Sequence, residues 1–414
     1  MNKFLLVTTS AMMLLALLFT KDNQFACQGT GIAKPYLQED VEVVNMDDIV
    51  NLGYKALYSR NPGAAGYYRS GADQEVTLAE NLKAFRKLRL RPRMLCGVSH
   101  RDQSVIVLRD QLLQVPVGIA PSAMQKLAHP QGEKAMARAA EKAGSVMILS
   151  TLSTTSLEEV RQAAPKANLW LQLYVFKDRQ ITRQLVRRAE KAGYNALVLT
   201  VDVPRFGHRV SDIRNHFSLP KHLRLGNFKN VDLQSFNSSN FGSGLEGYAN
   251  SLFDSSLTWR DLQYLKSITS LPVVVKGVMT AEDALLAKAS GASAIFVSNH
   301  GGRQLDGVAA TIEVLPEVVA AVGKHMDVYL DGGVMYGTDV IKALAIGAKA
   351  VFVGRPALWS LSYKGQKGVT KMFEIFKEEI DRTLALIGCR STSKLDPSMV
   401  VRRELYNNLW WYRK

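Results

Sequence analysis

From Val115 onward, the chain alternates short runs of valine, isoleucine and leucine with longer stretches of helical periodicity. This alternation is typical of repeated β-strand and α-helix units. The eight expected strands are VPVGIA from Val115, SVMILS from Ser145, LWLQLY from Leu169, ALVLTVD from Ala196, PVVVKG from Pro272, SAIFVS from Ser293, DVYLDG from Asp327 and KAVFVG from Lys349. Eight buried strands in one α/β chain predict a closed (β/α)8 barrel of the TIM type.

The helices between these strands carry signals at both of their ends. A glycine, which helix C-termini prefer, stands just before four of the strands, at Gly144, Gly193, Gly291 and Gly347. Capping-box spacing marks three helix starts, at Ser156 with Glu159, Thr258 with Asp261, and Thr280 with Asp283. The helix and strand predictions therefore agree along the chain.

Two segments extend the barrel. Residues 46–94 are helical and then irregular, which predicts an N-terminal helical extension that packs on or caps the barrel. A long stretch after the fourth strand includes SFNSSNFGSG and predicts an extended, mobile loop over the barrel mouth. A long helix after Gly368 is expected to complete the outer ring. No low-complexity linker divides the chain, so we expect one barrel domain over residues 40–392, followed by a C-terminal tail, 393–414.

The N-terminus has the pattern of a targeting segment. Lys3 precedes an apolar run from Phe4 to Phe19, and polar residues then lead to Ala26. Residues 1–26 are therefore expected to be a secretory signal peptide or, if uncleaved, a membrane anchor. We expect a secretory or extracellular location, with Asn237 as a glycosylation acceptor in the long loop. The last residues are not a peroxisomal address of the Ser-Lys-Leu type.

Charge and cysteine content limit the partners. The 52 lysines and arginines exceed the 37 acidic residues and give a formal charge of +15, which calls for an anionic partner to be considered. These basic residues are spread along amphipathic helices such as ITRQLVRRAEKAG, where they form a solvated face, and no nucleic-acid motif is present. The three cysteines are too few and too far apart for a disulfide framework or a thiolate zinc site. We therefore expect neither a nucleic-acid partner nor a metal.

The C-terminal ends of the strands, where barrel enzymes carry their active sites, are unusually polar. They carry Pro121, Ser122, Ser150, Gln172, Tyr174, Thr200, Asp202, Lys276, Ser298, Asn299, His300, Asp331, Gly354 and Arg355. Taken singly, Ser150, Gln172 and Thr200 are more simply explained by capping or packing. Capping or packing is a poorer explanation for the whole set, because unpaired polar residues at one mouth would cost desolvation free energy. The joint pattern predicts a site.

Three motifs indicate its chemistry. In VSNHGGRQLDG, His300 and Arg303 flank two glycines that let the backbone approach a ligand, and Arg209 follows the fourth strand. A histidine accepts a proton near neutral pH and arginines clamp carboxylates, so an anionic substrate that loses a proton is expected. The glycines of LDGGV and VFVGRP, with Arg355 beside them, favour a phosphorylated cofactor or substrate.

These motifs, together with IAPSAMQKLAHPQGE, LTVDVPRFGHR and GTDVIKALAIGA, resemble those of the FMN-dependent 2-hydroxy acid oxidases, the glycolate oxidase family. The resemblance runs from about Met46 through Gly388 and keeps the order and spacing of the motifs. It implies an FMN-binding barrel that oxidises an (S)-2-hydroxy acid to the 2-oxo acid and reduces O2 to hydrogen peroxide. It also implies a homo-oligomer, a tetramer in this family.

The resemblance assigns roles residue by residue. His300 is the implied base, Asp202 the partner of its imidazole, and Arg209 and Arg303 the clamps for the substrate carboxylate. Tyr67 in GYYRSGA and Tyr174 bind the substrate oxygens, and Leu152 lies over the substrate side chain. The implied flavin contacts are Pro121, Ser122, Ala123, Ser150, Gln172, Thr200, Lys276 and Ser298, and the implied ribityl and phosphate contacts are Asp331, Gly332, Gly333, Gly354 and Arg355.

Two positions depart from the family pattern. Met335 stands where the family commonly has an arginine toward the phosphate, and Leu152 stands where glycolate oxidases commonly have a tryptophan. The smaller leucine predicts a substrate longer than glycolate. The alternatives are a lactate-type or longer-chain dehydrogenase that uses another acceptor, and an inactive secreted barrel that acts as a binding protein. Whether His300 takes the carbon-bound proton, or the hydroxyl proton while a hydride leaves, stays open.

Overall fold

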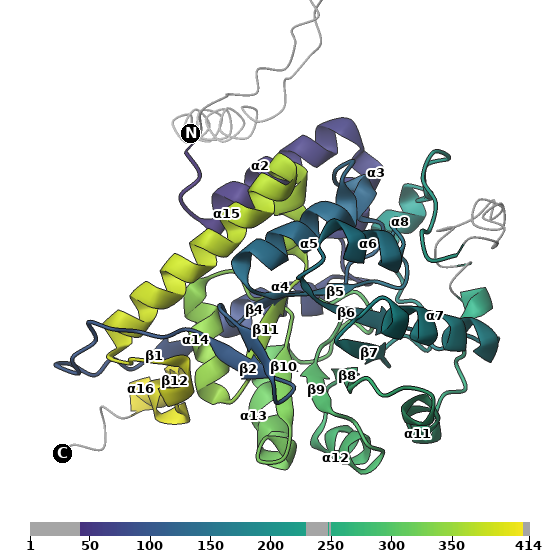
Figure 1. The fold of residues 1–414 in the computed structure, drawn as a ribbon. Coiled ribbons are helices and arrows are strands. Elements are labelled where there is room, and N and C mark those ends of the chain that lie inside the picture. The colour runs from purple at the N-terminus through teal and green to yellow at the C-terminus, as the bar shows by residue number, and fades with distance from the viewer. Residues whose placement is uncertain (1–41, 229–246, 248–249, 409–414) are drawn as a thin grey trace, which may run out of the picture. The chain divides into compact units, whose positions relative to one another are not determined.

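A closed barrel of eight parallel strands forms the centre of the protein (Figure 1). The computed structural model describes residues 42–228, 247 and 250–408. The barrel strands are β4 Val117–Ile119, β5 Val146–Leu149, β6 Asn168–Leu173, β7 Ala196–Thr200, β8 Val273–Val278, β9 Ala294–Val297, β10 Asp327–Leu330 and β11 Ala350–Val353. Each strand falls within a run predicted from the sequence, except that β6 begins one residue before its run and β8 ends one residue after its run. Strand β11 pairs with β4 to close the ring. The predicted (β/α)8 barrel is confirmed.

Helices surround the strands in the expected alternation. They are α5 Gly132–Ala143, α6 Leu157–Ala163, α7 Arg179–Lys191, α8 Val210–Arg214, α11 Trp259–Ser267, α12 Ala281–Ala289, α13 Thr311–Val322, α14 Gly337–Ile346 and α15 Arg355–Ile387. Ser156 caps α6 through the predicted box with Glu159, and Gly144 ends α5 in the left-handed conformation. The last helix begins at Arg355, before the expected start after Gly368, and non-helical torsions at Lys364 and Gly365 kink it.

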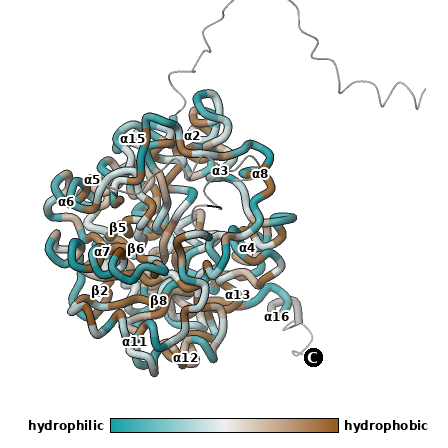
Figure 2. The backbone as a smooth tube through the Cα atoms, turned by 90° about the vertical axis from the view of Figure 1, so that its right-hand side faces the viewer, coloured by the Kyte–Doolittle hydropathy of each residue, from teal (hydrophilic) through white to brown (hydrophobic). Residues whose placement is uncertain are grey.

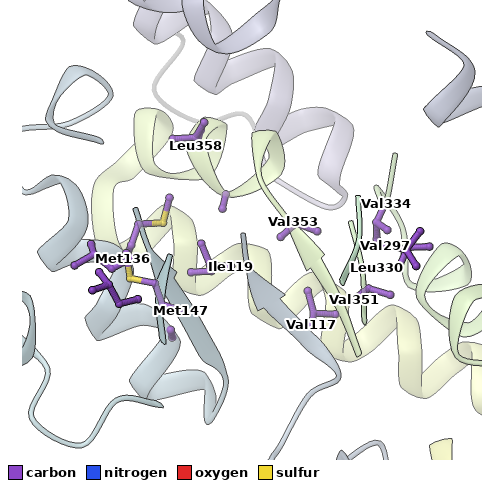
Figure 3. Close-up of a cluster of buried hydrophobic side chains, with 14 of the residues drawn as sticks. Val117, Ile119, Met136, Met147, Val297, Leu330, Val334, Val351, Val353 and Leu358 are labelled. Atoms are coloured by element: carbon purple, nitrogen blue, oxygen red, sulfur yellow. The ribbon is translucent and has the colours of Figure 1, made fainter. Parts of the chain in front are cut away.

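Side chains of the strands alternate between two apolar layers. Inside the barrel, the rings of Trp170, Phe296, Tyr329 and Phe352 contact one another and fill the interior. On the outer side, the valines of β4 and β11 and Ile119 of β4 belong to one cluster with Met136 of α5 and Leu358 of α15, as Figure 3 shows. Figure 2 shows the consequence, with hydrophobic residues along the strands and hydrophilic ones on the outer parts of the helices. The two layers hold the strand ends rigidly around one mouth.

The predicted N-terminal extension is helical and packs on the barrel. It consists of α2 Met46–Arg60, α3 Pro62–Arg69 and α4 Val76–Arg86. Helix α2 lies along α15 (Figure 1). A side chain at Gly53 would collide with the backbone of Trp359, so the glycine permits this close contact. Helix α3 carries Tyr67 toward the barrel mouth.

Two small antiparallel sheets were not predicted from the sequence. Strands β2 Val105–Val107 and β3 Gln111–Leu113 form a hairpin whose Val107 and Leu113 join the apolar cluster inside the barrel. Strand β1 Leu88–Leu90 pairs with β12 Val400–Arg402. The other short elements are η1 Gln125–Leu127, η2 Thr392–Lys394, η3 Pro397–Met399 and α16 Arg403–Asn408. The residues expected as a C-terminal tail therefore contribute a strand to the fold.

Two sequence predictions fall outside the described residues. They are the signal peptide or anchor at 1–26 and the part of the long loop that contains SFNSSNFGSG and Asn237. In the described ranges, the helices include none with the length and apolar character that a membrane span needs.

Candidate active site

The strand register gathers the predicted polar residues at one end of the barrel. Thr200 at the end of β7 lies opposite Lys276 of β8, and Gln172 is the penultimate residue of β6. Ser298 and Asp331 directly follow β9 and β10. All five side chains are buried. The mouth is therefore lined with polar groups from five successive strands, as the sequence predicted.

His300 and Asp202 form a hydrogen-bonded pair at this mouth. The Nδ1 atom of His300 lies 3.0 Å from Oδ1 and 3.2 Å from Oδ2 of Asp202. His300 has a φ of 57°, a strained conformation that two glycines directly follow. Burial lowers the pKa of His300, and Asp202 only partly offsets this effect. The imidazole is therefore neutral at neutral pH and able to accept a proton.

The carboxylate of Asp202 stays ionised. Burial acts to raise its pKa, but the interaction with His300, the positive charge of Lys276 and the hydrogen bond from His300 outweigh the effect of burial, and the pKa is lowered. An ionised Asp202 orients the ring through Nδ1 and leaves the other ring nitrogen, Nε2, for a substrate. The same carboxylate would stabilise the imidazolium once a proton arrives.

Lys276 is a buried cation at the centre of the mouth. Its Nζ donates to Ser298 Oγ at 2.8 Å and lies 3.5 Å from Asp331 Oδ2. Ser298 Oγ also accepts from the backbone N of His300 at 3.1 Å. The lysine is thus connected to the histidine loop through a single serine hydroxyl.

Arg209 and Arg303 place two positive charges beside Tyr67. The guanidinium of Arg303 lies 4.8 Å from the ring centre of Tyr67, and that of Arg209 lies 6.0 Å from it. Burial, and then the charge of Arg303, lower the pKa of Arg209 to about 10, which leaves it charged at neutral pH. Within the described part of the chain, neither arginine forms an ion pair with a carboxylate. The carboxylate of Asp212 acts on the charge of Arg209 without outweighing the effect of burial. Two guanidinium groups placed this close together form a site for an anion.

Two tyrosines complete the wall around these arginines. The ring of Tyr67 stacks on Phe217, with centres 4.4 Å apart, and the ring of Tyr174 stacks on Phe253 at 4.3 Å. Burial raises the pKa of Tyr174, so its hydroxyl stays protonated and can donate a hydrogen bond. The stacking fixes both rings in place.

The glycine-rich ends of β10 and β11 form the last part of the mouth. Gly332 and Gly333 have φ values of 89° and 84°, and a side chain at Gly333 would collide with the carbonyl of Asn81. Gly354 has open space on its side-chain face, where the nearest atom to a Cβ would be Ser122 Oγ at 3.9 Å. Backbone amides in such glycine-rich turns at helix starts suit a phosphate.

Arg355 has a structural set of contacts that the sequence did not predict. Its guanidinium donates to the carbonyls of Tyr68 at 3.0 Å, Gly301 at 2.9 Å and Ser70 at 2.9 Å. Burial lowers its pKa to about 9. Three of its five N–H groups therefore brace α3 against the histidine loop, and its predicted phosphate contact would use the remaining two.

Leu152 and Met335 occupy the two positions that depart from the family pattern. Leu152 is buried among apolar residues, and its backbone N donates to Ser150 Oγ at 3.1 Å. Met335 is partly buried, and its backbone N donates to Asp339 Oδ2 at 3.1 Å. Neither side chain offers a charge. Pro121, Ser122 and Ala123 follow β4 and are partly exposed at the mouth.

Two supports of the site carried no predicted role. Asn81 and Asn299 exchange amide hydrogen bonds of 2.9 and 2.8 Å, which join α4 to the histidine loop. The fully buried carboxylate of Glu133 accepts from Gln125 N, Thr154 N and the Thr155 hydroxyl, which joins the loops after β4 and β5. The sequence showed Asn299 as a strand-end residue and Glu133 as part of HPQGE, but it did not show their partners. Asn81 lies 218 residues from Asn299 along the chain. Thr154 and Thr155 lie 21 and 22 residues from Glu133.

Comparison with known proteins places this arrangement in a family. The family model described as FMN-dependent dehydrogenase matches residues 58–402. The chain belongs to this family. It is 50% identical over 341 residues to 2-Hydroxyacid oxidase 1 of Homo sapiens, covering 82% of this chain and 92% of that protein. It is 53% identical over 335 residues to Glycolate oxidase 3 of Oryza sativa subsp. indica, covering 81% and 90%. A crystal structure of mandelate oxidase with (S)-4-hydroxymandelic acid has a TM-score of 0.80 and 38% identity, covering 86% and 98%.

The family membership establishes an FMN-dependent 2-hydroxy acid oxidase, an oxidoreductase, and the predicted resemblance is confirmed. The oxidase interpretation fits these relatives better than the two alternatives, a dehydrogenase that uses another electron acceptor and an inactive binding protein. In the part of the chain that the structure describes, no three histidine, cysteine or acidic residues cluster as metal ligands would.

The residues at the mouth fit FMN. Three buried atoms there, Gln172 Nε2, Thr200 Oγ1 and Asp331 Oδ1, have no hydrogen-bond partner among the described residues. Buried polar atoms are normally satisfied, so a polar ligand accounts for them. An amide donor, a hydroxyl and a carboxylate oxygen match the polar ring edge and the ribityl hydroxyls of FMN.

Proposed function

We propose that this protein oxidises an (S)-2-hydroxy acid to the 2-oxo acid and passes the two electrons and two protons to O2, giving hydrogen peroxide. The observation that carries the proposal is the neutral His300, oriented by Asp202 and placed in the same mouth as Arg209 and Arg303. A base beside an anion site is what removal of a proton from a hydroxy acid requires.

The substrate is held by its carboxylate and its hydroxyl. Arg209 and Arg303 supply the charges for the carboxylate, and the hydroxyls of Tyr67 and Tyr174 bind the substrate oxygens. Arg303 already donates to the carbonyls of Tyr67 and Ser70, so its side chain is pre-oriented before substrate binds. This reduces the ordering cost of binding.

His300 takes the proton at Nε2. The resulting imidazolium is stabilised by the carboxylate of Asp202 at 3.0 Å from Nδ1. Both proposed routes, removal of the carbon-bound proton and removal of the hydroxyl proton with hydride transfer, use this same pair. When bound, FMN accepts the two electrons that leave the substrate.

FMN would be held by the groups that line the mouth. The residues assigned to its ring are Pro121, Ser122, Ala123, Ser150, Gln172, Thr200, Lys276 and Ser298. The residues assigned to its ribityl chain and phosphate are Asp331, Gly332, Gly333, Gly354 and Arg355. Lys276 supplies a positive charge that favours a reduced, anionic cofactor.

The preferred substrate has an intermediate chain length. Leu152, which the resemblance assigns to the substrate side chain, is smaller than the tryptophan that glycolate oxidases commonly carry. An apolar substrate chain beside it gains roughly 0.8 kcal/mol per buried methylene. Glycolate has no side chain and gains nothing.

The location and assembly also belong to this proposal. Residues 1–26 direct the chain to the secretory pathway, and a membrane association follows only if that segment is uncleaved. The barrel domain, 40–392, assembles as a homo-tetramer, as the family resemblance implies. N-terminal sequencing of secreted protein should begin near Cys27, whereas an intact N-terminus in the cytosol would refute the secretory location.

The test of the activity is a panel of 2-hydroxy acids, assayed for peroxide with the purified FMN-loaded enzyme. One mole of peroxide should form for each mole of 2-oxo acid. Oxidation that proceeds with an artificial electron acceptor but yields no peroxide in air would identify a dehydrogenase instead.

A further inference from the structure

Gln304 connects the two loops that carry the catalytic pair. Its Nε2 donates to the carbonyl of Asp202 at 2.8 Å and to that of Arg205 at 3.0 Å. Its Oε1 accepts from the backbone N of Gly207 at 3.2 Å and from Nη2 of Arg209 at 3.4 Å. Both polar atoms of one half-buried side chain are therefore used on the loop after β7, while the residue itself belongs to the loop after β9.

The two loops are also in direct backbone contact at this point. A Cβ at Gly207 would lie 2.3 Å from the carbonyl oxygen of Arg303 and 2.6 Å from that of Gln304. Nε of Arg209 donates to the same carbonyl of Arg303 at 3.4 Å. The glycine permits the approach, and the Gln304 side chain fixes it.

We infer that Gln304 is a positioning residue that holds Asp202 against His300 and Arg209 in the anion site. Gln304 lies four residues after His300 along the chain, so its amide ties the backbone of Asp202 to the loop that carries His300. The inference rests on the function proposed above, in which the His300 and Asp202 pair accepts the substrate proton. Gln304 contacts no reacting atom in this account.

Two substitutions separate the hydrogen bonds that Gln304 donates from those that it accepts. Gln304→Met keeps the length of the side chain and removes all four hydrogen bonds. Gln304→Glu keeps an acceptor for Gly207 and Arg209 but loses the donor to Asp202 and Arg205. The new carboxylate also pairs with Arg209 and competes with the carboxylate of the substrate. The control is Gln180→Met, at an exposed glutamine on α7.

The expected results are a fall in kcat in both variants and a rise in KM that is largest for Gln304→Glu. Loss of two neutral hydrogen bonds predicts a fall in kcat of roughly tenfold to a hundredfold. A looser Asp202 stabilises the imidazolium less, so the acid limb of the kcat/KM profile should move to lower pH. FMN occupancy and the control variant should match wild type.

The inference would be overturned if both variants kept the kcat, the KM and the acid limb of the kcat/KM profile of wild type. So would losses of activity that only follow losses of bound FMN or of folded protein, because those mark a structural role. The proposed function fails separately, if His300→Ala keeps wild-type turnover. A fully inactive His300→Ala beside unaffected Gln304 variants refutes the role of Gln304 alone.

Discussion

Substitution of Asp202 by asparagine tests the catalytic pair with a minimal change of shape. The carboxylate oxygen lies 3.0 Å from Nδ1 of His300, and asparagine keeps an oxygen that can accept from that atom. The charge is lost. Two unit charges about 4 Å apart interact by about 4 kcal/mol at an effective dielectric constant near 20. A retained neutral hydrogen bond recovers about 1 kcal/mol of this.

The remaining loss of about 3 kcal/mol corresponds to a fall in kcat on the order of a hundredfold. Anaerobic stopped-flow mixing with a 2-hydroxy acid should show the slower step as slower bleaching of the flavin absorbance. KM should change little, because Arg209 and Arg303 are untouched, and FMN should stay bound.

The matched control is Asp73→Asn, because Asp73 also faces a histidine, with its Oδ1 3.0 Å from Nδ1 of His208, but both side chains are exposed. That variant should keep wild-type rates. Flavin reduction by Asp202→Asn within threefold of wild type would refute the reasoning that the buried charge stabilises the imidazolium.

Four further predictions follow. Because burial lowers the pKa of His300, kcat/KM should fall only below about pH 6.5, as the imidazole gains its proton; a loss that begins well above pH 7 would contradict this. Wild type should prefer a substrate with two extra methylenes over glycolate by about tenfold in kcat/KM, and Leu152→Trp should reduce that ratio; an unchanged ratio would show that this position does not set chain length. Met335→Arg, which restores the arginine common in the family, should lower the Kd for FMN by about tenfold, measured by fluorescence titration, and an equal Kd would count against a phosphate near this position. Lys276→Met leaves the carboxylate of Asp331 buried and unpaired, so the apparent Tm of the FMN-free protein should fall by several degrees, and an unchanged Tm would be the contrary result.

Local patterns made the barrel predictable from the sequence. Each strand is a short, strongly apolar run. Ser156 and Glu159 mark the start of α6 and Gly144 marks the end of α5, and the hydrogen bonds of these caps join residues at most four apart in the chain. Because parallel strands of a barrel share one mouth, the strand-end residues could be grouped without knowledge of their contacts. The grouping of Gln172, Thr200 and Lys276 follows from this rule alone.

Contacts between distant segments could not be predicted in the same way. Strand β1 pairs with β12 more than three hundred residues away, and each strand has only three residues. The bonds of Gln304 to the loop after β7 span about a hundred residues, and nothing in RQLDG shows which carbonyls the amide meets. Arg355 illustrates the same limit, since its three carbonyl partners come from the end of α3 and from the histidine loop.

The most direct test of the central claim is anaerobic mixing of the FMN-loaded enzyme with a 2-hydroxy acid, for wild type and His300→Ala side by side. Wild type should show bleaching of the flavin absorbance, with one mole of 2-oxo acid formed for each mole of FMN. His300→Ala should keep its FMN and bleach slower by a factor on the order of 10²–10⁴, because only the base is missing. Bleaching of both proteins at the same rate would contradict the account.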